Sequence, residues 1–208
     1  MKQFFLAILL SLHSFLICAQ VTVDKSMDAT GIKDAFIILD HTFELDITNT
    51  SENRIIINSV AEGEHQNRIL IKAHRDNNSI HIVDDLQPFS TNYNDKLDAH
   101  KVIASKMKIE IPAHITVHVQ SSIANVNIQA RFKNLLIALT SGNCMLNSFI
   151  GNATINSTKG AITLFTKNAT VSAYSKSGNV TSEKISGIYE IDLKSNSGAI
   201  HVYKIKEF

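Results

Sequence analysis

The chain of 208 residues contains no tryptophan, only two prolines and only two cysteines. One cysteine, Cys18, lies in an apolar N-terminal segment, so a protein that loses this segment keeps only Cys144 and has no internal disulfide. Later in the chain there is no long apolar run, and we therefore predict no transmembrane segment after signal cleavage. The formal net charge is only +1. Basic residues are scattered singly, without a stripe of arginine and aromatic residues, which argues against nucleic-acid binding.

Motifs of common enzymatic chemistry are also missing. There is no Gly-rich phosphate loop and no Gly-x-Ser-x-Gly elbow. Between Ser121 and Tyr203 the only carboxylates are Glu183, Glu190 and Asp192, whereas glycosidases need two carboxylates at a fixed separation. Glu190 and Asp192 bracket an apolar residue on an expected strand, so both should point into solvent. We predict that the protein is not an enzyme and has no catalytic residues.

The sequence offers no convincing metal or cofactor site. His114 and His118 would share an ion on a helix, but on a strand they lie roughly 13 Å apart. Asp84, Asp85, Asp95 and Asp98 fall in one expected loop and could offer oxygen ligands to calcium, but they lack the glycine-bearing loop that calcium sites use. We therefore predict no metal ligands, no cofactor-binding residues and no cofactor.

Residues 1–19 have the composition of a secretory signal peptide. A single basic residue, Lys2, precedes a short apolar run that closes on Ala19. We expect cleavage between Ala19 and Gln20. The alternative is a lipid anchor on Cys18, but such a site needs a small residue before the cysteine, where this chain has Ile17. The remainder, residues 20–208, has the length of a single domain.

Alternating apolar and polar residues predict half-buried strands through residues 35–83 and again through 107–119. Ile-rich bursts are separated by turn clusters such as residues 49–53 and 76–79. The longest expected loop runs from Asp84 to Lys101. Pro112 lacks a backbone donor and is expected at a corner between two strands.

The last third of the chain repeats about every eighteen residues. The small residues that anchor the repeats are Ala124, Gly142, Gly160, Gly178 and Gly198. Two residues after each anchor comes an apolar residue, and Cys144 stands in this column, so we expect its thiol to be buried. A second strand follows within each repeat, and the corners are expected to need a positive φ or a close approach of two backbones.

A period this short holds one coil of stacked strands rather than two helices. We therefore predict an all-β fold, a short-coil β-solenoid (β-helix-like) with preceding antiparallel-type strands. Residues 20–120 would form the front strands and loop, and residues 121–208 the repeated coils. The C-terminal coil would end the stack, with Lys204, Lys206 and Glu207 placing charges along its edge.

Four segments resemble a known family. They are Thr140-Ser141-Gly142-Asn143, Lys176-Ser177-Gly178-Asn179-Val180, Asn196-Ser197-Gly198-Ala199-Ile200 and the preceding Met107-Lys108-Ile109-Glu110-Ile111-Pro112-Ala113-His114. They are similar to the bacterial "putative auto-transporter adhesin, head GIN domain" family and to related adhesin-like β-solenoid envelope proteins. The resemblance covers about residues 105–205, and it brings no catalytic residues to carry over.

This resemblance implies an exported, non-catalytic envelope protein in the periplasm or at the cell surface of a bacterium. Such a protein would bind or scaffold through the faces of its coils, and its expected partners are glycans or other envelope proteins. Two alternatives stay open. One is a carbohydrate-active β-helix enzyme, a polysaccharide lyase or glycosidase. The other is a periplasmic sensor or assembly partner of a membrane system.

Overall fold

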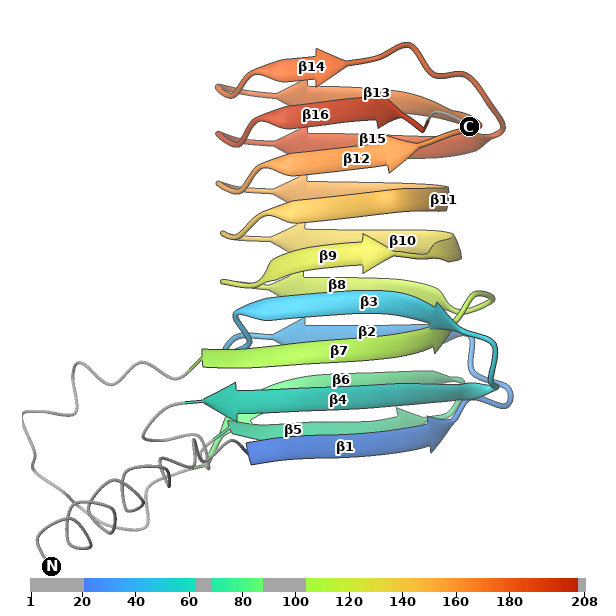
Figure 1. Ribbon diagram of the computed structural model, residues 1–208, viewed down its shortest axis with the longest axis vertical. Coiled ribbons are helices and arrows are strands. Elements are labelled where there is room, and N and C mark those ends of the chain that lie inside the picture. The colour runs from blue at the N-terminus through green and yellow to red at the C-terminus, as the bar shows by residue number, and fades with distance from the viewer. Residues whose placement is uncertain (1–20, 63–68, 88–103, 206–208) are drawn as a thin grey trace, which may run out of the picture.

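The computed structural model describes residues 21–62, 69–87 and 104–205 (Figure 1). These ranges contain strands and no helix, and so none of their segments could cross a membrane as a helix. The expected signal peptide lies outside these ranges. So do most of the expected loop, including Asp95 and Asp98, and the charged residues Lys206 and Glu207.

Sixteen strands make up the described part of the chain. They are β1 (Val21–Asp28), β2 (Asp34–Leu39), β3 (Glu44–Thr50), β4 (Arg54–Glu62), β5 (Ile69–Asp76), β6 (Ser79–Leu86), β7 (Ala104–Pro112), β8 (Thr116–Ser121), β9 (Asn125–Gln129), β10 (Arg131–Leu139), β11 (Cys144–Ser157), β12 (Ile162–Thr166), β13 (Ala169–Ser175), β14 (Val180–Ser182), β15 (Tyr189–Ser195) and β16 (Ile200–Lys204).

All sixteen strands belong to one mixed sheet that folds into two facing walls (Figure 1). The front wall has the order β1-β4-β7-β3-β9-β11-β12-β16-β14, and the rear wall has the order β5-β6-β2-β8-β10-β11-β15-β13. Strand β11 belongs to both walls because it bends between them, at Ser148 (φ 51°) and Gly151 (φ 140°).

The predicted short-coil β-solenoid is wrong, because the strands do not stack in the order of the chain. Strand β3 lies between β7 and β9, and β16 lies between β12 and β14. The pairs β1–β4, β4–β7 and β5–β6 are antiparallel, whereas the other pairs are parallel. The fold is therefore all-β, as expected, but it is a nearly closed, barrel-like mixed sheet.

The repeat nevertheless gives the correct register of its first strands. Cys144 pairs with Val126 on one side and with Ile162 on the other, and Ile200 pairs with Ile162 and Val180. Residues two apart face the same side of a sheet, so a common period aligns these side chains whichever strands are neighbours. The period therefore sets the register but not the order of strands.

The C-terminal strand does not end the stack, contrary to the sequence prediction. Strand β16, which contains Lys204, is covered by β12 on one side and by β14 on the other. The last strands of the two walls are instead β13 and β14, so the end of the barrel is formed by residues 169–182.

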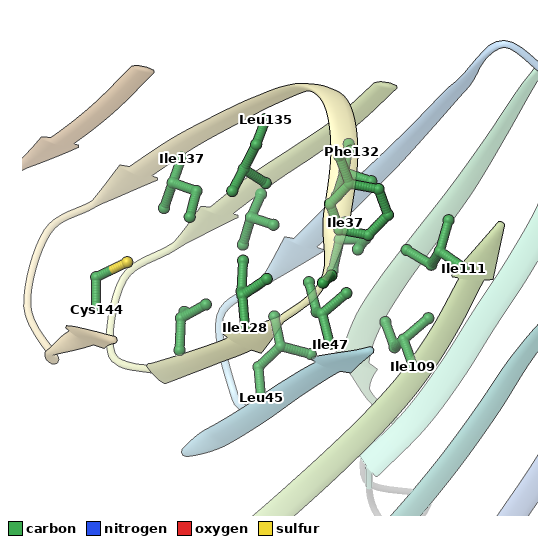
Figure 2. Packing of buried hydrophobic residues seen from close by; sticks show 14 of the residues in the cluster. Ile37, Leu45, Ile47, Ile109, Ile111, Ile128, Phe132, Leu135, Ile137 and Cys144 are labelled. Carbon is green, nitrogen blue, oxygen red and sulfur yellow. The ribbon is translucent and has the colours of Figure 1, made fainter. Parts of the chain in front are cut away.

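The core fills the space between the walls with the inward side chains of both walls. Leu45, Ile47 and Ile128 of the front wall face Ile37 and Ile137 of the rear wall (Figure 2). Alternate residues of β2, β6 and β8 are buried, because successive side chains of a strand point to opposite faces. Cys144 is buried as predicted, with 1% of its surface exposed.

The glycine anchors are required by a close approach between neighbouring corners. A Cβ atom on Gly160 would lie 1.5 Å from the carbonyl oxygen of Gly142, and one on Gly198 would lie 1.9 Å from that of Gly160. Of the four glycine anchors only Gly142 has a positive φ, of 90°. A positive φ therefore does not explain Gly160, Gly178 or Gly198, where the lack of a side chain matters instead.

A serine three residues before an anchor completes many of these corners, a feature that the sequence reading missed. The Oγ atoms of Ser121, Ser175 and Ser195 accept hydrogen bonds from the backbone N–H of the anchor, over 3.0, 3.0 and 2.9 Å. Ser157 Oγ instead donates to the carbonyl of Gly160 over 3.0 Å. These bonds satisfy polar groups of a backbone that is partly or fully buried.

Asp84 holds the corner between β2 and β3. Its carboxylate accepts four hydrogen bonds, from the backbone N–H of Asp40 (2.7 Å), His41 (3.0 Å) and Thr42 (2.6 Å) and from Thr42 Oγ1 (2.7 Å). The sequence placed Asp84 at the start of a long loop, but β6 continues to Leu86 and the side chain is buried. Its oxygens are occupied by this corner, which excludes the calcium role considered for it.

Replacing Gly160 with alanine tests the close approach. We expect Gly160→Ala to lower the free energy of unfolding by at least about 3 kcal/mol, since the added methyl group overlaps the Gly142 carbonyl and forces the corners apart. Gly31→Ala is the matched control: its Cβ would be 3.6 Å from the Arg75 side chain, and only its φ of 75° opposes the change, at a cost of about 1 kcal/mol. Equal urea midpoints for the two variants would contradict this explanation.

The corner at Asp84 can be tested by an isosteric change. In Asp84→Asn an amide group replaces one carboxylate oxygen and points a donor at other donors, so we expect a loss of about 2–3 kcal/mol in the free energy of unfolding. Asp85→Asn is the control, because Asp85 is a surface carboxylate whose pKa is lowered by a hydrogen bond from Lys72. Its urea midpoint should stay close to that of the wild type. Similar losses in both variants would refute a special role for Asp84.

Thiol labelling tests the burial of Cys144. Burial raises the pKa of the Cys144 thiol to about 12, so at pH 8 the native thiol is both protonated and inaccessible. We expect labelling to be slow in the native protein and rapid in denaturant, with the native rate set by opening of the fold. Rapid labelling without denaturant would place Cys144 outside the core.

Candidate ligand-binding face

Three adjoining hollows lie along the outer face of the rear wall. Their volumes are about 800, 570 and 320 Å³. Leu136 and Thr154 line both the first and the third hollow, while Gln120, Ala138 and Asn156 line both the second and the third. The hollows therefore form one continuous surface that is centred on β8, β10, β11 and β15 and reaches β2 on one side and β13 on the other.

We call the central part of this surface the groove face. It consists of the outward side chains of four strands: Thr116, His118, Gln120, Asn134, Leu136, Ala138, Asn152, Thr154, Asn156, Glu190, Asp192 and Lys194.

In-register pairing arranges the groove face in rows. Gln120 lies beside Ala138, and Ala138 lies beside Asn156. Neighbouring strands are about 4.8 Å apart, so the short side chain of Ala138 leaves a gap flanked by two amides. In the next row, Leu136 lies between His118 and Thr154 and provides an apolar floor.

The chemistry of the groove face is neutral and polar. Each amide side chain offers two donors and an acceptor, and each threonine offers a hydroxyl that does both. The side-chain oxygen Oδ1 of Asn152 accepts a hydrogen bond from the backbone N–H of Glu190 over 3.0 Å, which fixes the orientation of the Asn152 amide. The charges are few, and Lys194 neutralises the Asp192 carboxylate through a direct hydrogen bond.

A ladder of stacked rings borders one side of the groove face. The ring of Phe36 stacks on His118 at a centroid distance of 4.4 Å and on His81 at 4.9 Å, and His81 stacks on His74 at 5.2 Å. Asp34 Oδ1 lies 3.1 Å from His118 Nε2. The ladder fixes the position of His118, whose ring lines the third hollow.

The front wall has a separate hollow of about 510 Å³ near the end of β16. Phe165 and Tyr203 stack there at 5.0 Å, and Glu183 accepts a hydrogen bond from the backbone N–H of Lys204 over 2.7 Å. The Glu183 carboxylate therefore anchors the loop after β14 to the neighbouring strand. This gives one of the few acidic residues of the repeats a structural role.

The residues considered from sequence for metal or acid chemistry do not come together. His114 is exposed in the turn after β7, whereas His118 is held in the ring ladder on β8. Glu190 and Asp192 point outward and bracket the buried Ile191, as expected. Within the described ranges no group of three or more His, Cys, Asp or Glu side chains is placed to hold a metal ion.

The groove face itself was missed by the sequence reading. Its amides and hydroxyls are scattered over residues 116–194, and in sequence they read as ordinary outward positions of strands. A signal was present in the form of Asn134, Asn152 and Asn156, which stand at the outward positions of two neighbouring repeats. Only the pairing of β10 with β11 shows that they are adjacent.

Comparisons with known proteins support the fold and do not assign a family. No protein-family model matches the chain, and no curated protein matches it. The resemblance to the head GIN domain family therefore stays a hypothesis.

Solved structures do match. A "putative cell adhesion protein" from Clostridium sporogenes is 15% identical, with a TM-score of 0.63, over 90% of this chain and 100% of that one. A "putative adhesin" from Bacteroides fragilis is 13% identical, with a TM-score of 0.38, over 89% and 97%. A "putative lipid binding protein" from Parabacteroides distasonis is 12% identical, with a TM-score of 0.30, over 90% and 97%. At these identities the similarity to the Clostridium sporogenes protein shows a shared fold and nothing more.

Proposed function

We propose that the protein is an exported, non-catalytic binding protein of the adhesin type that binds neutral glycans through its groove face. The observation that carries this proposal is the row in which Gln120 and Asn156 flank the gap at Ala138, next to the apolar floor of Leu136. A shallow polar face of this kind suits a ligand that is itself neutral and rich in hydroxyl groups.

The chemistry of a sugar ring matches this arrangement. Its hydroxyls both donate and accept, as amide and threonine side chains do, so each can be satisfied without a charge. Its C–H faces pack on apolar side chains such as Leu136. The pairing of Asp192 with Lys194 leaves little net charge to attract an anionic polymer.

Other properties complete the proposal. Residues 1–19 act as a signal peptide, residues 20–208 form one domain, and the mature protein resides in the periplasm or at the cell surface of a bacterium. The fold shared with a "putative cell adhesion protein" supports the adhesin type. The carboxylates favour binding over the alternative of a polysaccharide lyase or glycosidase. A glycosidase needs two carboxylates that flank the scissile bond, whereas Glu190 and Asp192 project side by side from one strand and Asp192 is paired with Lys194. The Glu183 carboxylate is tied to β16.

Calorimetry against a panel of neutral and acidic oligosaccharides tests the proposal. We expect a neutral oligosaccharide to bind, and we expect the double variant Gln120→Ala and Asn156→Ala to bind it at least roughly tenfold more weakly, because two pairs of hydrogen bonds are lost. Gln129→Ala is the matched control, since Gln129 is an exposed glutamine on β9 of the front wall. Its affinity should equal that of the wild type.

Three results would overturn the proposal. The first is binding that is confined to acidic oligosaccharides. The second is an affinity for the neutral oligosaccharide that is the same in the double variant and in the wild type. The third is the release of shortened products from the bound glycan, which would establish the enzymatic alternative. Fractionation of the cells that export the protein tests its location separately.

A further inference from the structure

The two ends of the barrel differ in how their edge strands are protected. One end is formed by β1 and β5, and the other by β13 and β14 (Figure 1). Strands β1 and β5 carry charged residues along their length, with the sequences VTVDKSMD and ILIKAHRD. Charges on an edge strand oppose pairing with another chain, because they would have to be desolvated or placed against like charges.

The end formed by β1 and β5 is also closed by its own side chains. Lys25 Nζ donates a hydrogen bond of 2.6 Å to the carbonyl oxygen of Ile71, which joins the edge strands of the two walls. Arg75 Nη2 donates a second bond of 2.8 Å to the carbonyl oxygen of Thr30. One carbonyl of the edge strand β5 and one of the turn after β1 therefore already have internal partners.

The end formed by β13 and β14 has the opposite character. The sequences of its two strands, ATVSAYS and VTS, contain no charged residue and no proline. Among the described strands, β13 pairs only with β15, and β14 only with β16. Large apolar side chains are exposed here, with exposed fractions of 61% for Tyr174, 42% for Val180 and 76% for Ile188.

We propose that this end pairs with a second copy of the chain, edge to edge, about a two-fold axis perpendicular to the two walls. Such an axis runs through both walls, so β13 pairs with β13 of the other copy and β14 with its own counterpart, both antiparallel. Because the opposite end is charged and closed, the association stops at a dimer and does not continue into a fibre.

The sequence of β13 fits this symmetry. Directly opposed residues of an antiparallel pair share one face of the sheet, so the axis passes midway between the two copies of one residue. The middle residue of β13 is Ser172, which then lies opposite its own counterpart. In this register the half-buried Val171 of one copy lies opposite Ala173 of the other, which extends the core across the interface. Thr170 lies opposite Tyr174 on the outer face, and no charges are opposed.

The dimer has a consequence for ligand binding that rests on the proposed function. A two-fold axis perpendicular to the walls leaves both rear walls on the same side of the dimer. The two groove faces then form one surface of double length, on which a long polymer can contact both copies, with a gain in avidity.

Sedimentation and light scattering of the mature protein give the direct test. We expect the wild type to have twice the mass of one chain at high concentration and to dissociate on dilution. Ser172→Lys places two ammonium groups opposite each other at the axis, so its dissociation constant should rise by roughly fivefold or more. Thr22→Lys is the matched control, since Thr22 is exposed on β1 of the opposite end, and its dissociation constant should not change.

Two further measurements distinguish a weakened interface from a folding defect in Ser172→Lys. An equimolar mixture of Ser172→Lys and Ser172→Glu should restore dimers of mixed composition, which ion exchange separates from the single variants. Oxidised Ser172→Cys should form a covalent dimer, because facing Cβ atoms at the axis come within disulfide range. A monomeric wild type, or a wild-type dimer that neither weakens in Ser172→Lys nor cross-links at position 172, would overturn the proposal.

Discussion

The distance between neighbouring corners governs the rest of this structure. At four successive corners the Cα of an anchor glycine faces the carbonyl oxygen of the anchor in the neighbouring corner, and an added Cβ atom would overlap that oxygen. Backbones that meet this closely hold the strands on both walls at the spacing that parallel hydrogen bonding needs. The hydroxyls of Ser121, Ser175 and Ser195 accept hydrogen bonds from backbone N–H groups of the same kind of corner. The polar backbone groups of these narrow corners therefore have partners within the protein.

The groove face is a consequence of this regular spacing. When corners keep their neighbours in register, outward residues of consecutive strands line up in rows, whatever their distance along the chain. Gln120 and Asn156 are far apart in sequence but flank the same alanine, because β8, β10 and β11 are paired without a shift over this segment. A flat row of neutral side chains suits extended ligands better than a small substrate, which needs a deep enclosed pocket.

The shape of the barrel also separates positions that a sequence would group together. His114 lies in a turn, whereas His118 belongs to the ladder of stacked rings. Their spacing of four residues, which would bring them together on a helix, therefore does not form a metal site. The Asp84 carboxylate accepts hydrogen bonds from the corner between β2 and β3, and the Glu183 carboxylate accepts one from the backbone of β16. In each case a carboxylate or imidazole that resembles a functional group in sequence satisfies a local structural need.

The sequence by itself determined that the fold is all-β, that Cys144 is buried, and that Val126, Cys144 and Ile162 share one column. These properties follow from local alternation and from a constant period, which a single chain displays in full. The order of the strands and the groove face were decided only by the tertiary structure. Repeats of equal length present interchangeable edges, so their period leaves open which repeat pairs with which. That choice rests on long-range contacts, such as the insertion of β3 between β7 and β9 and of β16 between β12 and β14.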